Sequence, residues 1–275
     1  MYNNQMAQHR RPPLGQVFLA DGRVIGRIMS ALAVEPDDAV LEIGPGPGTM
    51  TELLAERAAK LWAVEVDGKL AAGLREKFAG AANVEVVEAD ILKVSIEALC
   101  EAAGRERIRV FGNLPYYITS PILLRLFEFH ERIADITVMV QREVAERIVA
   151  KPGSKEYGLF SVTCQYYTEP SMLFSIPPQA FRPPPQVTSA LVGMRVAPKK
   201  EKLGIEDEKG FMRLVQAAFG QKRKTLVNNW KGLCDPERLR EAMAELGIDA
   251  RARAETLGLE QLAGLVRAVH TGRHS

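Results

Sequence analysis

Short apolar runs alternate with amphipathic segments between Asp38 and Gln141, and this alternation limits the fold more than any other feature. The apolar runs predict strands at 39–43, 61–66, 84–90, 108–113 and 136–141, with helices such as 49–60, 68–78 and 121–130 between them. Continuously apolar strands separated by helices are typical of a parallel sheet that is covered on both faces. The pattern therefore predicts an α/β, Rossmann-like fold.

After Gln141 the pattern changes. We expect a helix at 142–150, strands at 159–167, 171–176 and 189–196, and no helix in the proline-rich stretch IPPQAFRPPPQV. From Pro198 the chain is charged and predicts helices at 208–219, 221–231, 236–246 and 259–270. The expected organisation is a tail at 1–13, a sheet domain at 14–197 and a small helical domain at 198–275.

The composition is that of an ordinary globular protein, with 47% hydrophobic and 25% charged residues among 275. No apolar run is long enough to span a bilayer, so we expect no membrane association. Cys100, Cys164 and Cys234 lie far apart, which suits reduced thiols in a cytoplasm. The four histidines lack metal-ligand spacing, so we expect no metal, and nothing requires more than a monomer.

A glycine loop follows the first predicted strand of the sheet. The segment LEIGPGPGTMT places Gly44, Gly46 and Gly48 between that strand and a helix, where backbone can approach a ligand closely. Glu65 ends the second strand, placed to accept hydrogen bonds from ribose hydroxyls, and Asp67 is a nearby competitor for that role. Asp90 ends the third strand, where it could accept from an adenine amine. Together these features predict a cofactor that contains adenosine.

The spacing of the loop distinguishes between two such cofactors. A dinucleotide loop normally reads G-x-G-x-x-G and binds a pyrophosphate through backbone amides. This loop reads G-x-G-x-G, and Pro45 and Pro47 lack the amide hydrogen that a phosphate would need. The loop therefore favours S-adenosyl-L-methionine over a nicotinamide dinucleotide.

The fourth predicted strand ends in FGNLPYYIT. Methyl transfer to an aromatic amine requires that the nitrogen lone pair be drawn out of the ring. The amide oxygen of Asn113 and the main-chain carbonyl of Leu114 could accept the two N–H bonds, and Tyr116 could stack on the base. We therefore expect catalysis by positioning and electrostatics, without a general base.

Seven motifs together carry a resemblance to a known family. GQVFL, EIGPGPGTMT, VEVD, EADIL, GNLPYYI, FRPPPQVTSALV and FGQKRKTL lie between about Leu14 and Asn229. In this order they resemble the ribosomal RNA adenine N6-dimethyltransferases, in particular the branch that modifies two adjacent adenosines near the 3′ end of small-subunit (16S) rRNA. The resemblance implies a seven-stranded methyltransferase sheet, a small all-helical C-terminal domain and a role in 30S subunit biogenesis.

The resemblance also implies roles for single residues. Phe181 corresponds to a second aromatic that sandwiches the flipped adenine opposite Tyr116. Val17 replaces the usual Asn or His, so it can contact the cofactor only through backbone or packing, and Tyr117 replaces a common Asn. The implied cofactor-binding residues are Gln16, Val17, Leu19, Gly44, Gly46, Glu65, Asp90 and Asn113.

Basic side chains are the candidates for holding rRNA. The net charge is only +2, so their clustering matters more than their number. The candidates for phosphate contacts are Arg10, Arg11, Arg147, Lys151, Lys222, Arg223 and Lys224.

Three alternatives remain open from the sequence. The first is the related large-subunit adenine methyltransferase of the macrolide-resistance type. The second is a mainly non-catalytic ribosome-assembly factor that keeps the fold. The third, a nicotinamide dehydrogenase, lacks the phosphate-loop spacing.

Overall fold

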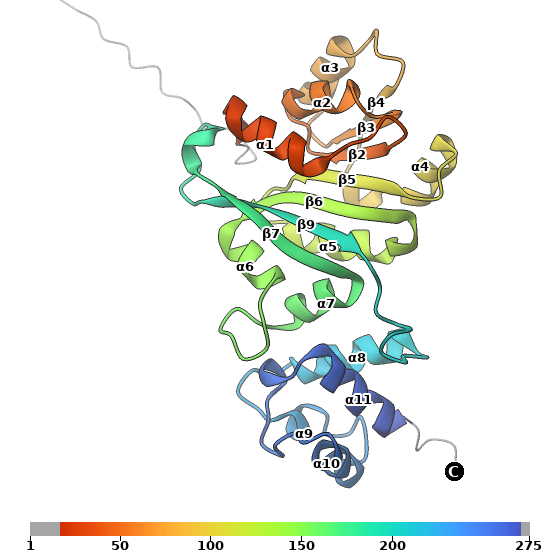
Figure 1. Ribbon diagram of the computed structural model, residues 1–275, viewed down its shortest axis with the longest axis vertical. Helices are drawn as coiled ribbons and strands as arrows, with labels where there is room; N and C mark the ends of the chain where they lie inside the picture. Colours follow the sequence, from red (N-terminus) through yellow and green to blue (C-terminus); the bar gives the residue numbers. More distant parts are fainter. Residues whose placement is uncertain (1–16, 271–275) are drawn as a thin grey trace, which may run out of the picture.

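The computed structural model describes residues 17–270, and a mixed sheet of seven strands forms its centre (Figure 1). The strands lie in the order β4 (Val84–Glu88), β3 (Lys60–Glu65), β2 (Ala39–Ile43), β5 (Ile108–Asn113), β6 (Ile133–Gln141), β9 (Ser189–Val196) and β7 (Thr168–Ile176). The first five pair in parallel, and β9 runs antiparallel to both of its neighbours. The predicted Rossmann-like sheet is confirmed.

The order of the strands reverses at β2. From β2 the chain goes first to β3 and β4 on one side and then to β5 and β6 on the other. In open α/β sheets, ligands bind at the carboxyl ends of the strands that flank such a point. Gly44 directly follows β2 and Asn113 ends β5, so both lie at this position.

Helices cover both faces of the sheet. On one face, α1 (Gly22–Leu32) and α2 (Thr49–Ala55) pack against Val40 and Phe111. On the other face, α4 (Ile96–Ala103), α5 (Thr119–Glu128) and α6 (Arg142–Ile148) pack against the remaining side of the strands. The remaining helix of this part of the chain, α3 (Gly68–Lys77), contacts β3 and β4. Since side chains of a strand alternate between faces, Val40 and Glu42 of β2 both point toward the α1–α2 layer.

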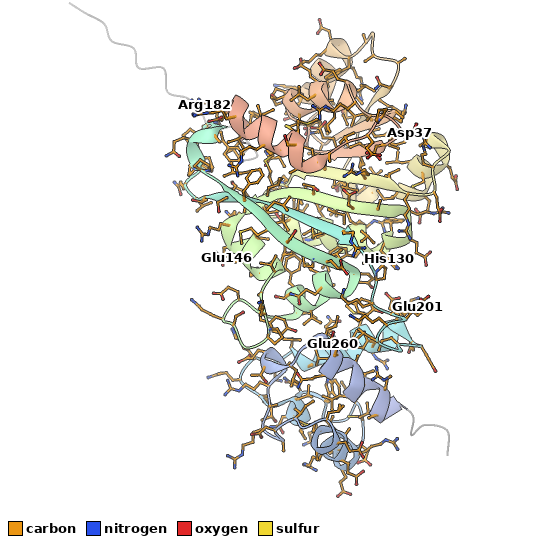
Figure 2. All side chains as sticks on the ribbon, viewed as in Figure 1. Asp37, His130, Glu146, Arg182, Glu201 and Glu260 are labelled. Carbon is orange, nitrogen blue, oxygen red and sulfur yellow. The ribbon has the colours of Figure 1, made fainter. Side chains whose placement is uncertain are left out.

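Two short strands form a ribbon at the carboxyl edge of the sheet. β1 (Phe18–Leu19) pairs antiparallel with β8 (Phe181–Arg182), which lies between β7 and β9 in the chain. In Figure 2, Arg182 of β8 and Asp37, which precedes β2, lie at opposite ends of the sheet. The β1–β8 ribbon therefore lies at the end where the glycine loop emerges.

The C-terminal helices form a separate layer below the sheet (Figure 1). Their core contains Phe211, Trp230 and Leu262, and the Trp230 indole N–H donates to the Leu214 carbonyl at 2.8 Å. No helix between residues 17 and 270 is long and apolar enough to cross a membrane. The helices of this layer are α8 (Glu208–Ala218), α9 (Leu226–Asn229), α10 (Pro236–Glu245) and α11 (Leu259–His270). Along the whole described chain, 3-10 turns occur at Ile91–Lys93, His130–Arg132, Pro178–Ala180 and Ala254–Thr256.

The strand predicted at 159–167 is wrong, because this segment is the helix α7 (Leu159–Tyr167). Its Cys164 belongs to the core under the sheet, whereas Val162 and Tyr166 belong to the core of the C-terminal helices. A helix that is buried on several sides is apolar around its whole circumference and loses the 3.6-residue period. The two domains therefore share α7, and the boundary near Ala197 stays a prediction.

The helix predicted at 221–231 is also wrong in its extent. Residues 220–224 form a turn, and only α9, four residues long, is helical. Thr225 caps α9 by accepting a hydrogen bond from the Asn228 amide at 3.4 Å, so the helix begins after the basic residues.

Candidate active site

The glycine loop adopts a conformation that needs glycine. Gly44, Gly46 and Gly48 have φ angles of 67°, 59° and 82°, in the left-handed region. A Cβ atom on Gly46 would lie 2.8 Å from two ring carbons of Phe18, so β1 lies directly on the loop. The ring of Phe18 in β1 thus packs directly on the backbone of the glycine loop at Gly46.

Glu65 is connected to this loop by a hydrogen bond. Its side chain is buried, Oε2 accepts from the Gly46 amide at 3.1 Å, and Oε1 accepts from the Asp67 amide at 3.0 Å. A carboxylate has about four acceptor positions, so Glu65 keeps capacity for ligand hydroxyls. Asp67 instead caps α3, because its Oδ1 accepts from the amides of Lys69 and Leu70 at 2.9 and 3.2 Å.

Asp90 lies on the same edge of the sheet, two residues beyond the end of β4. Its Oδ1 accepts from the Leu92 amide at 3.0 Å, which holds the side chain in place. Asp90 does not line either of the cavities described below. Its predicted contact with an adenine amine stays a prediction.

The side chain of Asn113 is oriented by a hydrogen bond to the main chain of Val17, the residue just before β1. Its Nδ2 donates to the Val17 carbonyl at 3.0 Å, and no donor among the described residues contacts its Oδ1. Leu114 is buried, and its amide donates to the Met139 carbonyl at 3.1 Å, which ties the turn to β6. The amide oxygen of Asn113 therefore stays available as an acceptor.

Tyr116 is held by a residue that the sequence did not single out. Its hydroxyl and the Ser189 Oγ lie 2.9 Å apart in a hydrogen bond, and Ser189 is fully buried at the start of β9. Ser189 falls within the motif VTSALV, so the motif was the only signal for it. The neighbouring Tyr117 is 71% exposed and points away from the core.

These residues enclose a cavity of about 70 Å³. It opens between the glycine loop, β1 and the turn after β5. The lining residues are Val17, Phe18, Gly44, Gly46, Glu65, Asn113, Leu114, Pro115 and Tyr116.

One residue predicted to belong to this site, Phe181, lines neither cavity of the site. Phe181 is fully buried, in the core with Leu19, Ile28 and Met29, and does not line the cavity beside Tyr116. The structure therefore does not bring the two aromatic rings face to face. Leu19, its partner in the β1–β8 ribbon, is buried as well but lines the second cavity described below. Gln16 lies outside the described residues.

Glu42 was not predicted to belong to the site. It is 2% exposed and lines a second cavity of about 30 Å³, which shares Phe18, Gly44 and Asn113 with the first. Its Oε2 has no hydrogen-bond partner among the described residues. Burial raises the pKa of Glu42 to about 7, the nearby hydroxyl of Thr51 lowers it, and the charge of Glu65 raises it further. A charged residue inside the apolar strand AVLEI was the signal that could have found it.

The chemistry of this donor set fits S-adenosylmethionine. Glu65 and Asp90 offer acceptors for hydroxyl and amine hydrogens. The unpartnered buried oxygen of Glu42 requires a donor or a positive charge. A cofactor with a ribose and a cationic end satisfies both requirements.

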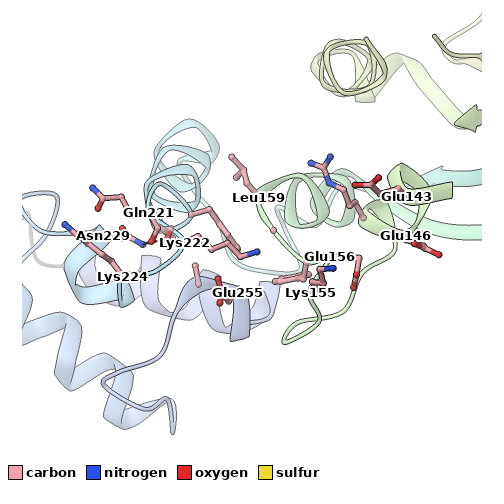
Figure 3. A pocket seen from close by; sticks show the side chains of 16 residues that line it. Glu143, Glu146, Lys155, Glu156, Leu159, Gln221, Lys222, Lys224, Asn229 and Glu255 are labelled. Atoms are coloured by element: carbon pink, nitrogen blue, oxygen red, sulfur yellow. Dashed lines mark hydrogen bonds between the residues drawn. The ribbon is translucent and has the colours of Figure 1, made fainter. Parts of the chain in front are cut away.

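A larger cleft separates the sheet domain from the C-terminal helices (Figure 3). Its volume is about 540 Å³, and it brings together Arg147, Lys222 and Lys224 from distant parts of the sequence. Lys155 also lines it, as do the carboxylates of Glu143, Glu146, Glu156 and Glu255. The cleft is therefore mixed in charge, not uniformly basic.

The lysines of the cleft are free to bind an anion. Within the described part of the chain, Lys155, Lys222 and Lys224 form no ion pair, whereas Glu146 is paired with Arg142 at 2.8 Å. Asn229 holds the basic turn, because its Nδ2 donates to the carbonyls of Ala218 and Gln221 at 2.6 and 3.2 Å.

The other basic residues of the prediction do not join the cleft. Lys151 and Arg223 are exposed but do not line it, and Arg10 and Arg11 lie outside the described residues. No group of three or more His, Cys, Asp or Glu side chains between residues 17 and 270 could hold a metal ion.

A methyltransferase that uses S-adenosylmethionine is the class of protein that this sheet and this site define. The family model described as "Ribosomal RNA adenine dimethylase" matches residues 7–270. The chain belongs to that family.

Curated relatives agree with this assignment. The chain is 46% identical to "Ribosomal RNA small subunit methyltransferase A" of Koribacter versatilis, over 96% of this chain and 95% of that protein. It is 43% identical to the protein of the same name from Moorella thermoacetica, over 94% and 92%.

Two solved structures share the fold over nearly their whole length. A dimethyladenosine transferase from Plasmodium falciparum superposes with a TM-score of 0.73 at 21% identity, covering 90% of this chain and 95% of that one. The 23S rRNA methyltransferase ErmE superposes with a TM-score of 0.72 at 27% identity, covering 92% and 99%.

Proposed function

We propose that this enzyme dimethylates N6 of two adjacent adenosines near the 3′ end of 16S rRNA, within the 30S subunit or its precursor. One observation carries the chemistry: the Val17 carbonyl binds the amide nitrogen of Asn113 and leaves its Oδ1 as an acceptor in a cavity that reaches Glu65. Relatives named for the small subunit are 43–46% identical to the chain, whereas the 23S rRNA enzyme is 27% identical. These identities favour the small-subunit branch.

The cofactor would lie between the glycine loop and the strand ends. Glu65 would accept from ribose hydroxyls, Asp90 from the adenine amine, and Gly44 and Gly46 would allow close approach of the backbone. When bound, S-adenosylmethionine supplies an electrophilic methyl group.

The protein's own part in transfer is to prepare the target nitrogen. Asn113 Oδ1 and the Leu114 carbonyl accept the two N–H bonds, which draws the lone pair out of the adenine ring. The ring of Tyr116, held by Ser189, stacks on the base. No side chain needs to take a proton before the methyl group moves.

Access to this site requires a movement at β1. A cavity of about 70 Å³ is smaller than the roughly 300–1,000 Å³ of typical ligand pockets. Phe18 lies on Gly46, so β1 must shift to admit the cofactor, and Leu19 pairs with Phe181 in the same ribbon. A shift of the ribbon would expose Phe181 and let it reach the base opposite Tyr116.

The cleft of Figure 3 is the proposed RNA contact. Lys222, Lys224 and Arg147 would bind phosphates on either side of the extruded nucleotide, which must leave its helix to reach Asn113. Arg10, Arg11, Lys151 and Arg223 would add contacts outside the cleft. The enzyme would act as a monomer in the cytoplasm, where small subunits assemble.

The test is transfer of labelled methyl from S-adenosylmethionine to undermethylated 30S subunits and, in parallel, to 23S rRNA, with mapping of the modified base. Dimethyladenosine near the 3′ end of 16S rRNA is the expected product. Label only in 23S rRNA would place the protein in the large-subunit branch.

A mainly non-catalytic assembly factor would behave differently. It would bind 30S precursors tightly without transferring label, and the Asn113→Ala variant would still support their maturation. Loss of maturation in that variant, with RNA binding intact, would exclude this second class.

A further inference from the structure

We propose that the exposed ring of Tyr117 stacks on the nucleotide next to the target adenosine and holds it while the target is methylated. The inference rests on the proposed function and adds a second base contact to it. It begins from a ring that packing does not explain: Tyr117 is 71% exposed, more than any other large apolar side chain between residues 17 and 270. A single exposed apolar side chain is ordinary in itself, so its position and its support carry the inference.

Tyr117 stands directly beside the residue that is expected to contact the target base. Tyr116 lines the cavity into which the Asn113 side chain points, whereas Tyr117 lines neither cavity of the site. Adjacent Cα atoms lie about 3.8 Å apart, and stacked bases of one strand are spaced by roughly 3.4 Å. The base that neighbours the target in the RNA chain is therefore within reach of Tyr117 when the target rests on Tyr116.

The turn that carries Tyr117 is held by its own hydrogen bonds. The Ile118 amide and the Thr119 hydroxyl each donate to the Pro115 carbonyl at 3.1 Å, so the backbone is fixed on both sides of the exposed ring. A tyrosine on an ordered backbone has only two side-chain torsions to lose on binding. Such preorganisation lowers the free-energy cost of a contact with a ligand.

The same turn lies next to the helix that leads to the cleft of Figure 3. The hydrogen bond between Tyr116 and Ser189 places the turn over the start of β9, and the Arg142 amide donates to the Thr188 carbonyl at 3.0 Å just before β9. Arg142 begins α6, and α6 carries Arg147 into the cleft. RNA whose phosphates lie in the cleft therefore passes this turn on its way to the cavity.

The chemistry of the exposed ring fits a nucleobase. Every base has a flat π-face, so stacking on an aromatic side chain tolerates any sequence and needs no hydrogen-bond partner on the protein. The proposed substrate supplies such a base, because its two target adenosines are adjacent. While one adenosine rests on Tyr116, the other stacks on Tyr117 and stays outside the RNA helix, ready for its own methylation.

A paired change in the protein and in the RNA tests this contact. The substrates are undermethylated 30S subunits in which one of the two target adenosines is replaced by a nucleotide without a base, and kcat/KM is measured for methyl transfer to the adenosine that remains. Wild-type enzyme should lose about five- to 150-fold on one of the two abasic substrates, and Tyr117→Ala should lose as much for the same adenosine on intact subunits. Tyr117→Ala should lose nothing further on that abasic substrate, because the stack can be lost only once.

Three further variants provide the matched comparisons. Tyr117→Phe keeps the ring and should stay within about twofold of wild type, whereas Tyr117→Leu keeps an apolar side chain without a π-face and should behave as Tyr117→Ala. Leu124→Ala changes another exposed apolar residue, in α5, and should transfer as wild type does. Calorimetric binding of S-adenosylmethionine should be the same for all variants, which shows that each is folded.

The outcomes separate this inference from the proposed function. If the losses multiplied on both abasic substrates, or if Tyr117→Ala or Tyr117→Leu transferred at the wild-type rate, the stacking role of Tyr117 would be overturned while the reaction of the enzyme stood. If wild-type enzyme transferred no methyl group to intact 30S subunits, the proposed function would be overturned, and the role of Tyr117 with it.

Discussion

The side-chain nitrogen of Asn113 donates a 3.0 Å hydrogen bond to the main-chain carbonyl of Val17, although the two residues are 96 positions apart in the sequence. The bond determines which end of the amide faces the cavity, because the nitrogen is occupied and the oxygen is not. Val17 therefore acts through its main-chain carbonyl, because its side chain cannot form a hydrogen bond. The N-terminal segment thus orients the residue on which the proposed chemistry depends.

Asn113→Ala removes the side-chain acceptor, so we expect methyl transfer to fall by about a hundredfold or more while RNA affinity is unchanged. Single-turnover transfer and RNA binding would be measured side by side. Val17→Ala is the matched control, because it keeps the carbonyl and should retain most of the rate. A variant of Asn113 that transfers at nearly the wild-type rate would disprove the acceptor model.

Tyr116→Phe and Ser189→Ala each remove one end of the same hydrogen bond, so each should slow transfer by about two- to tenfold. The double variant should be no slower than either single variant, because the bond can be lost only once. A double-mutant cycle on kcat/KM checks this expectation. Effects that multiply would show that Ser189 does not act through Tyr116.

Glu42→Gln should stabilise the cofactor-free protein at high pH. The folded protein has a raised pKa for Glu42, about 7 against 4.5, so it holds a proton that the unfolded chain has lost between these values. Stability of the wild type therefore falls as pH rises through this window, by up to about 3 kcal/mol. Urea unfolding at pH 4 and pH 8 should show little difference at the lower pH and a more stable variant at the higher. If the free energies of unfolding of variant and wild type differed by the same amount at both pH values, the raised pKa of Glu42 would be refuted. Glu56→Gln, at an exposed carboxylate, is the control.

Gly46→Ala should weaken cofactor binding strongly. The added Cβ would lie 2.8 Å from the Phe18 ring, and the φ of 59° is unfavourable for alanine. The double variant Phe18→Ala/Gly46→Ala should recover part of the affinity, because it relieves the clash but not the backbone strain. Gly73→Ala in α3 has open space around its Cβ and should be neutral or stabilising. Calorimetric titration of all three proteins would test this, and no recovery in the double variant would show that Phe18 is not the obstacle.

Lys222→Ala and Lys224→Ala should each weaken RNA binding and reduce the salt dependence of the binding constant by about one unit of slope. Cofactor affinity should not change, because the cleft lies outside the cofactor site. Arg57→Ala, at an exposed residue beyond α2, serves as the control. A slope identical to that of wild type for both lysine variants would remove the cleft from the RNA path.

The sequence by itself determined the central sheet and most of the proposed site. Each strand of the parallel part is a local apolar run, and Glu65, Asp90 and Asn113 stand at the ends of such runs. Parallel strands carry their carboxyl ends to one edge, so local patterns were sufficient to place these residues on the same edge of the sheet. The glycine loop was equally local, because three positive φ angles within five residues require glycine.

Only the tertiary structure decided the features that depend on distant neighbours. Residues 159–167 form a helix because two cores bury α7, and this removes the amphipathic period from its sequence. Phe181 is buried because β8 pairs with β1, which starts 163 residues earlier. The burial of Glu42 without a partner for its Oε2, and the cleft that both Arg147 and Lys222 line, likewise arise from packing between elements. Local periodicity cannot encode such contacts, because they depend on which surfaces meet after the chain has folded.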